Sequence, residues 1–311
     1  MKYYINEFSP KDFCMNLYFL MRMNIKEMLI EQRQATVFNG ILAAAAISKE
    51  YAEKYKKEIQ HLLETGGFTF YPSRQIAKYD ASQIEGGLDN SNGLPFVMHH
   101  GKRLYYPKNY SVEKAKKTYY EIATYDAILG KEANGSAHQY QSENYFLPKG
   151  GVIVDVGCAE ALFALDNIET ADKAILIERN QDWIKALQAT FAPYGDKVKI
   201  VNKLVSGEDS KSTITLQTLI GQEDKPVFVK MDIEGYEVET IRSARKLLEQ
   251  KDNITLSCCT YHNNNDAAQL ENLFNEMGYT IEYSDGYMLF TRYDQPKYPF
   301  FRHGLIRAKK A

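Results

Sequence analysis

Two short apolar runs dominate the hydrophobic pattern in the middle of the chain. Val152 to Val156 is interrupted only by Asp155, and Lys173 to Glu178 contains four consecutive aliphatic residues before its final acid. Short, nearly continuous apolar runs of this kind are typical of strands that are buried on both faces of a parallel sheet. A glycine at position 157 and a helical pattern from about Glu160 separate the two runs. This pattern predicts the strand–turn–helix–strand unit of an α/β fold.

Further elements follow this unit. Apolar or alternating runs predict strands over 197–201, 227–232 and 254–261. A hairpin is expected next, with strands 279–283 and 287–293 joined by Ser-Asp-Gly, which is a strong turn signal. The tail from Pro296 is basic and aromatic, and we interpret it as a solvated end.

The first third of the chain has a different pattern. Residues 10–64 show apolar positions at helical spacing and stop at Gly66-Gly67, whereas 68–95 is rich in Gly, Ser, Asn and Asp and is expected to be a loop. A small hairpin is expected over 96–106, and Ser111 is the expected cap of a helix that ends near residue 129. We therefore divide the chain into a helical and linker region, 1–95, and a main domain, 96–311. The helical region either packs on the main domain, caps a substrate pocket or forms a homodimer interface.

Composition and charge narrow the class of partner. The chain has 311 residues, is 44% hydrophobic and carries a net charge of −2. A broad basic field is absent, which argues against a nucleic acid partner. The longest apolar stretch, Ile41 to Ile47, is too short to cross a membrane. The four cysteines form no Cys-x-x-Cys pair, and free thiols suit a cytoplasmic protein.

The turn after the first buried strand bears on the cofactor. A dinucleotide fingerprint needs Gly-x-Gly-x-x-Gly, but Ala159 and Leu162 stand where the second and third glycines would be. Glu178 follows Asp155 by 23 residues and ends the second strand, where an acid can accept hydrogen bonds from ribose hydroxyls. A ligand with a ribose and an amino group but no pyrophosphate fits these residues, and S-adenosyl-L-methionine is such a ligand.

Two segments resemble known methyltransferase motifs. Val154-Asp-Val-Gly-Cys-Ala-Glu-Ala161 resembles the Asp-x-Gly-x-x-x-Gly motif of class I S-adenosylmethionine-dependent methyltransferases, with alanine in place of the last glycine. Val229-Lys-Met-Asp-Ile-Glu-Gly-Tyr-Glu237 resembles the Lys-Ile-Asp-x-Glu-Gly-x-Glu segment of the FkbM family. The FkbM pattern usually has Asp where Gln217 stands. The resemblance covers about residues 136–293.

The resemblance implies both a fold and a reaction. The fold is α/β, a Rossmann-like seven-stranded, mostly parallel sheet with a terminal antiparallel hairpin, here preceded by the helical region. The implied reaction is O-methylation of a hydroxyl on a sugar or another small-molecule natural product. S-adenosyl-L-methionine is the implied cofactor, and its expected ligands are Asp155, Gly157, Cys158, Glu178, Ser206 and Tyr140. Tyr140, like His138, lies in the segment before the first strand, which commonly folds over the cofactor in such enzymes.

Candidate catalytic residues lie at the carboxyl ends of two central strands. Asp232 and Glu234 follow the fourth strand, and His262 follows the fifth. Ligands of open α/β sheets bind at such strand ends, so Asp232 or His262 is placed to remove a hydroxyl proton. The structural alternative is that the acids cap the next helix, which we prefer for Glu237. Lys230 is expected to pair with one of the acids, and we predict no metal.

Other functions remain open from the sequence. An oxidoreductase with a nicotinamide cofactor would share the fold, although the missing glycines argue against it. A non-catalytic binding module would keep the fold, recruit a partner through the helical N-terminus and tolerate the alanine and glutamine departures. A methyltransferase that acts on RNA is a weaker alternative, because the charge is nearly neutral.

Overall fold

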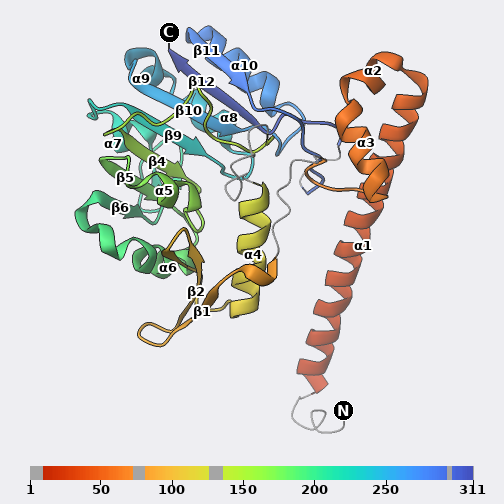
Figure 1. Cartoon of the computed structure of the whole chain (residues 1–311), viewed down its shortest axis with the longest axis horizontal. Helices are drawn as coiled ribbons and strands as arrows, with labels where there is room; N and C mark the ends of the chain where they lie inside the picture. Colours follow the sequence, from red (N-terminus) through yellow and green to blue (C-terminus); the bar gives the residue numbers. More distant parts are fainter. Residues whose placement is uncertain (1–9, 73–80, 126–135, 293–295, 311) are drawn as a thin grey trace. The chain divides into compact units, whose positions relative to one another are not determined.

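The computed structural model of the chain describes residues 10–72, 81–125, 136–292 and 296–310, with side chains of the first helix from residue 27 onward. The chain forms two compact units. The first comprises residues 1–72 together with 289–300, and the second comprises 73–288 together with 301–311 (Figure 1). No helix among the described residues is both long and apolar enough to cross a membrane.

The first unit is helical, as the sequence predicts. It contains α1 (Pro10–Ile47), α2 (Lys49–Lys54) and α3 (Lys56–Thr65). Ser48 begins α2, and its side chain accepts a hydrogen bond from the backbone amide of Tyr51. The predicted stop at Gly66 is confirmed, because Gly66 caps α3 in the left-handed conformation at φ +72°.

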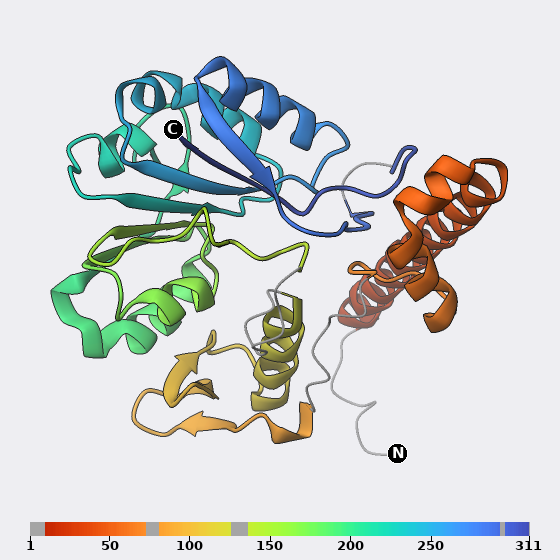
Figure 2. The ribbon, with the colours of Figure 1, turned by 45° about the horizontal axis from the view of Figure 1, so that its top comes forward.

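A seven-stranded sheet forms the centre of the second unit (Figure 2). Its order is β6-β5-β4-β9-β10-β12-β11, and β12 alone runs antiparallel to both of its neighbours. The predicted mostly parallel sheet of seven strands is therefore confirmed. The strands are β4 (Val152–Val156), β5 (Lys173–Ile177), β6 (Val198–Val201), β9 (Val227–Met231), β10 (Ile254–Cys259), β11 (Tyr279–Tyr283) and β12 (Leu305–Lys310).

The order of the strands decides where a ligand can bind. The chain passes from β4 outward to β5 and β6 and then returns to β9 on the other side of β4. In open α/β sheets this reversal leaves a crevice at the carboxyl ends of the central strands, where ligands bind. The helices that connect and cover the strands are α5 (Leu162–Asn167), α6 (Gln181–Phe191), α7 (Leu216–Ile220), α8 (Glu237–Ser243), α9 (Arg245–Gln250) and α10 (Asp266–Glu276).

Burial explains the apolar strand runs. Every residue of β4 and of β9 is buried, so these strands are covered on both faces. One buried cluster joins the sheet to α8, α9 and α10 through side chains such as Val154, Val229, Ile241 and Phe274. β4 and β9 were recognisable from sequence because both of their faces lie in the core.

A second, three-stranded sheet precedes the central one. It contains β1 (Gly86–Asp89), β2 (Leu94–His99) and β3 (Lys102–Tyr105), and its β2–β3 hairpin confirms the prediction for 96–106. The expectation that all of 68–95 is loop was wrong, because 86–89 pairs with β2. After β3, α4 (Val112–Tyr125) begins with Ser111, whose Oγ accepts from the amide of Lys114 at 3.1 Å. The predicted end of that helix near 129 lies outside the described residues.

The C-terminal segment corrects two expectations. The partner of β11 is β12, not residues 287–293, and the basic tail is not a solvated end. Arg307 is buried in β12, where its Nη1 donates to Glu282 Oε1 at 2.7 Å and its Nε donates to the carbonyl oxygen of Tyr140 at 3.2 Å. Because Glu282 balances the charge of Arg307 and the guanidinium N–H groups have acceptors, this basic segment can lie inside the sheet.

Candidate active site

The turn after β4 is a constrained glycine turn. Gly157 has φ +72°, and a Cβ at this position would lie 2.1 Å from the backbone oxygen of Asp232. No other residue fits there without moving β9. Ala159 and Ala161 also have positive φ, +45° and +60°. Ala161 thus adopts the conformation that favours glycine, which stands at this place in the methyltransferase motif.

Glu178 closes this turn from β5. Its Oε2 accepts from the amide of Ala159 at 3.1 Å, and its Oε1 accepts from the amide of Asn180 at 2.6 Å. The structure therefore brings the acid that was predicted to bind ribose against the predicted cofactor turn. Cys158 lies in the same turn, but it is buried, and burial raises the pKa of its thiol well above the ordinary range. The thiol is therefore a neutral packing group.

Asp155 and Lys230 form a buried pair beneath the turn. They occupy neighbouring positions of β4 and β9, with Lys230 Nζ 3.0 Å from Asp155 Oδ1, and Nζ also donates to the carbonyl oxygen of Gly157 at 3.1 Å. Burial raises the pKa of Asp155, although Lys230 opposes that shift. Burial also disfavours the charged amine, but Asp155 and Asp232 outweigh it and raise the pKa of Lys230. Lys230 was expected to pair with one of the acids after β9, but its partner is Asp155 on β4, which is placed to support the turn through Lys230.

Asp232 lies directly after β9, beside the glycine turn. Its side chain is 23% exposed. Its carboxylate lies 3.4 Å from the hydroxyl of Tyr140 and 3.5 Å from the hydroxyl of Tyr261, both of which donate to it. Burial alone would raise the pKa of Asp232, but the nearby His262 and Lys230 outweigh it and lower the pKa. Asp232 is therefore an ionised, partly exposed acceptor at neutral pH.

His262 lies between three acids and is fully buried. Its Nε2 is 3.5 Å from Asp232 Oδ1 and 3.7 Å from Glu234 Oε2, and its Nδ1 is 3.2 Å from Glu237 Oε1. Burial disfavours the imidazolium, but Glu237, Asp232 and Glu234 outweigh it and raise the pKa of His262. The structure therefore brings together all three candidate catalytic residues, with Glu234 at the exposed edge.

The sequence analysis missed the role of Glu237. Its side chain is buried, and its Oε1 accepts from the amide of Ile233 at 2.8 Å while facing His262. Glu237 therefore orients the histidine and closes the loop after β9, in addition to starting α8. Its place in the same short motif as Asp232 was the available signal.

The segment before β4 supplies a second set of neighbours. Tyr140 and His138 are buried, and His138 Nε2 lies 3.8 Å from Asp232 Oδ2 and 3.5 Å from Cys259 Sγ. Both residues were candidates for this pocket, whereas Cys259 and Tyr261 were not singled out. Two groups of side chains here could each hold a metal ion: His138 with Asp232 and Cys259, and Asp232 with Glu237 and His262. The prediction of no metal stays a prediction.

Ser206 is not brought to this cluster. It follows the short strand β7 (Leu204–Val205), which pairs with β8 (Thr213–Ile214). It lines a separate cavity of about 180 Å³ together with Gly207, Thr215, Leu216, Gln217, Ser243, Ala244, Lys246 and Leu247. No other candidate residue lines that cavity, so Ser206 stays a prediction without structural support.

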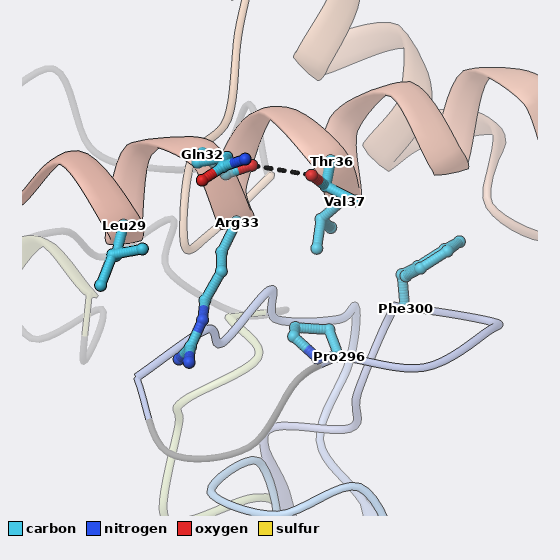
Figure 3. Close-up of a pocket in the computed structure, with 7 residues that line it drawn as sticks. All are labelled: Leu29, Gln32, Arg33, Thr36, Val37, Pro296 and Phe300. Carbon is cyan, nitrogen blue, oxygen red and sulfur yellow. Dashed lines mark hydrogen bonds between the residues drawn. The ribbon is translucent and has the colours of Figure 1, made fainter.

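The helical unit has a cavity of its own. It measures about 320 Å³ and is lined by Leu29, Gln32, Arg33, Thr36, Val37, Pro296 and Phe300 (Figure 3). The hydroxyl of Thr36 donates to the backbone oxygen of Gln32 at 2.8 Å within α1. This cavity contains no candidate active-site residue, and it combines an apolar wall with one guanidinium.

The residues at the sheet edge fit S-adenosylmethionine. The turn at Gly157 leaves no room for a side chain, and the carboxylate of Glu178 and the backbone of Asp232 lie against it. Carboxylates suit a ligand with hydroxyls and positive charge better than they suit a pyrophosphate. The fold and the residues at its sheet edge are those expected of a class I S-adenosylmethionine-dependent methyltransferase.

The family comparison agrees. Residues 188–281 match the model of the methyltransferase FkbM domain. The match confirms the FkbM-type recognition and S-adenosylmethionine as the cofactor. The matched range contains the ends of β9 and β10, with Asp232, Glu234, Glu237 and His262, whereas the turn after β4 precedes it. No curated protein sequence matches the chain.

Solved methyltransferase structures are similar at a low level. Precorrin-6y C5,15-methyltransferase from Geobacter metallireducens is 18% identical, with 53% of this chain and 82% of that chain covered and a TM-score of 0.36. A provisionally assigned methyltransferase from Streptococcus mutans in complex with SAH is 13% identical over 53% and 91%, with a TM-score of 0.35. A provisionally assigned tRNA (m1A22) methyltransferase from Streptococcus pneumoniae is 15% identical over 53% and 66%, with a TM-score of 0.36. Likeness at this level does not select an acceptor.

Proposed function

We propose that the protein transfers the methyl group of S-adenosylmethionine to a hydroxyl oxygen of a sugar or another small-molecule acceptor. The observation that carries the proposal is Asp232. It is an ionised, partly exposed carboxylate next to the glycine turn, with His262 and Glu237 buried behind it. Methyl transfer to oxygen needs an acceptor for the hydroxyl proton, and Asp232 is placed to be that acceptor.

The residues of the chain have distinct parts in this reaction. The bound cofactor supplies a methyl group that the sulfonium has already activated. The glycine turn and Glu178 hold the cofactor, and Asp155 and Lys230 keep the turn in place. Asp232 would take the proton of the acceptor hydroxyl, so that its oxygen can accept the methyl group that the cofactor would supply. Such general base catalysis typically contributes about 10²–10⁴-fold.

His262 has a positioning part. Its Nδ1 faces the buried Glu237, and its Nε2 faces Asp232. A histidine held in this way orients the carboxylate and keeps it ionised. The phenols of Tyr140 and Tyr261 also point to Asp232, and their rings offer flat surfaces beside it. Rings combined with hydroxyl and carboxylate groups suit a sugar or a small polyhydroxylated molecule.

We assign this activity to the second unit, residues 73–288 and 301–311, because β1 and the start of β2 lie before residue 96, where the sequence analysis began the main domain. The capping or homodimer role expected for the helical region stays a prediction. A cytoplasmic enzyme that acts on small molecules agrees with the net charge of −2, which provides no broad basic field for nucleic acid.

Cofactor binding is tested first, by calorimetric titration of S-adenosylmethionine. We expect the wild type to bind and Glu178→Ala to lose at least about tenfold in affinity, because one lost charge-assisted hydrogen bond is worth roughly 1.5–3 kcal/mol. Glu208→Ala is the matched control, since Glu208 is exposed and its side chain lies outside the turn. A wild type that copurifies without cofactor and does not bind it would refute the proposal.

The transferred methyl group is then followed with isotopically labelled S-adenosylmethionine. Sugars, other small hydroxyl compounds and RNA are offered as acceptors, and the product is examined by NMR for an O-methyl carbon. We expect Asp232→Asn to lower kcat by about 10²-fold or more, whereas the exposed Asp224→Asn leaves it unchanged. Methylation of RNA, transfer to nitrogen, or binding without turnover on any acceptor would each contradict the proposal, and the last would support the binding module.

A further inference from the structure

The β2–β3 hairpin carries a second cluster of ionisable side chains, separate from the candidate active site. His99 ends β2, His100 is the first residue of the turn, and Asp166 lies in α5. His99 Nε2 is 2.5 Å from Asp166 Oδ1, and His100 Nδ1 is 3.3 Å from the same oxygen. One carboxylate from a helix therefore lies against two imidazoles from neighbouring positions of a hairpin.

The backbone explains why two consecutive side chains meet. Successive side chains of a strand point to opposite faces. His100, however, has φ +48° and Gly101 has φ +80°, as in the two-residue turns that join hairpin strands. The turn places the His100 ring 4.1 Å from the His99 ring, centroid to centroid. A histidine in this left-handed conformation is uncommon, and here it directs a second imidazole to Asp166.

We propose that His99, His100 and Asp166 form a binding site for a divalent transition-metal ion such as Zn²⁺. Imidazole and carboxylate are ligands that suit Zn²⁺, at about 2.0–2.2 Å from the ion. Tetrahedral ligands at that distance lie roughly 3.3 Å apart. The His100–Asp166 separation already has this value, and the His99–Asp166 pair has to open by less than about 1 Å.

The surroundings of the three groups agree with a site of this kind. His99 is completely buried, and its Nδ1 lies 2.7 Å from the hydroxyl of Tyr119 in α4. A metal-binding histidine usually holds such an outer partner, which fixes the ring and leaves the other nitrogen for the ion. Asp166 and His100 are 22% and 58% exposed, so an ion can enter from solvent and keep a water ligand.

The side chain of Lys102 is a nearby cation that would repel the metal ion, but an acid balances its charge. Lys102 Nζ donates to the backbone oxygen of Leu165 at 3.1 Å and lies 3.6 Å from Glu169. The ion would link the hairpin to α5, which begins directly after the glycine turn of the active site. A bound ion would therefore hold the three-stranded sheet against α5, and it would take no part in the reaction.

The test is a titration of the untagged, chelator-treated full chain with Co²⁺, whose visible absorption reports ligands and geometry, followed by displacement with Zn²⁺. His100→Gly removes one ligand and suits the left-handed turn, so it keeps the fold. We expect it to weaken binding at this site at least about tenfold, and Tyr119→Phe to weaken it roughly 10–100-fold through the outer partner. His61→Ala, on a helix of the first unit, is the matched control and should bind as the wild type does.

A parallel titration of His262→Asn separates this site from the histidine cluster at the sheet edge. We expect that variant to retain the hairpin site. If the wild type binds no Co²⁺, or if His100→Gly and the wild type have the same affinity and spectrum, the metal site is refuted. The cluster is then a hydrogen-bonded Tyr119–His99–Asp166 network that only joins three elements.

Discussion

At the scale of single residues, the turn after β4 shows how a motif tolerates a departure. Gly157 is fixed by space, because a side chain would collide with the backbone of Asp232. At position 161 only the backbone conformation favours glycine. Ala161 is buried there and adopts φ +60°, in the left-handed region. An alanine can adopt the left-handed region at a cost of roughly 1–2 kcal/mol. The turn is therefore retained although the motif glycine is not.

Replacing Ala161 with glycine should therefore be nearly neutral. The relief of backbone strain, roughly 1–2 kcal/mol, is offset by about 0.5–1 kcal/mol of chain entropy and by about 0.8 kcal/mol for the buried methyl group. We expect the free energy of unfolding of Ala161→Gly to stay within about 0.5 kcal/mol of the wild type.

Ala164→Gly is the matched comparison, because Ala164 is equally buried but lies inside α5. There the helix propensity and the methyl group are both lost, and we expect about 2 kcal/mol of destabilisation. Urea unfolding of both variants measures the difference. Equal losses at the two positions would show that the left-handed conformation of Ala161 carries no strain.

At the scale of elements, sequence predicts the strands whose two faces lie in the core. β4, β5 and β9 are short apolar runs, interrupted only by Asp155 in β4 and Lys230 in β9, and their burial agrees with that pattern. β12 was missed because Arg307 and two lysines give it a polar pattern, and because its partners lie far away in the sequence. Neither the pairing with distant strands nor the neutralisation of Arg307 by Glu282 can be recognised from the residues of β12 alone.

The candidate site was predictable for a related reason. The carboxyl ends of neighbouring parallel strands lie at one edge, so acids and histidines at these ends converge. Asp155, Glu178, Asp232 and His262 were found in this way. Ser206 ends a short strand outside the central sheet, where the rule does not apply. Glu237 follows its strand by a loop, and only the fold brings it back to His262.

Arg307 provides a test of the β12 assignment. Its side chain is 5% exposed and holds Glu282 as well as the backbone oxygens of Tyr140 and Gln139. Arg307→Met keeps most of the volume but leaves those acceptors unpaired, so we expect a loss of about 2 kcal/mol or more. Arg242→Met, in an exposed pair with Glu239, should lose less than about 1 kcal/mol. If the two variants lose the same unfolding free energy in thermal or urea unfolding, the side chain of Arg307 lies in solvent and the β12 assignment is wrong.

At the scale of the whole sheet unit, charged groups cross three neighbouring strands at one edge. Asp155 on β4 pairs with Lys230 on β9, and Asp232 after β9 faces His262 after β10. Glu237 and Glu234 are the other acids that face His262. The raised pKa of His262 makes the folded state bind a proton more tightly than the unfolded chain, so this interaction depends on pH.

The sign of the pH dependence follows from that direction. The stability that His262 contributes is fully present below its unfolded pKa of about 6.5 and is lost as the pH rises through the higher folded value. The difference in unfolding free energy between wild type and His262→Asn should therefore shrink as the pH rises above about 6.5. The single tryptophan, Trp183, lies in α6 and reports this unit by fluorescence.

His61→Asn is the control, since His61 lies in α3 of the other unit and should leave the pH profile unchanged. A difference that is flat with pH, or that grows as the pH rises, would show that His262 is neutral in the folded protein.

The position of β12 also has a consequence for synthesis. β12 lies between β10 and β11, although β11 precedes it in the chain by more than twenty residues. Until β12 has been synthesised, β10 and β11 have no partner between them, and the backbone groups along their facing edges stay unpaired. A nascent chain of this protein therefore exposes two unpaired strand edges until Lys310 has left the ribosome. Chaperones that shield strand edges have their greatest effect in that interval.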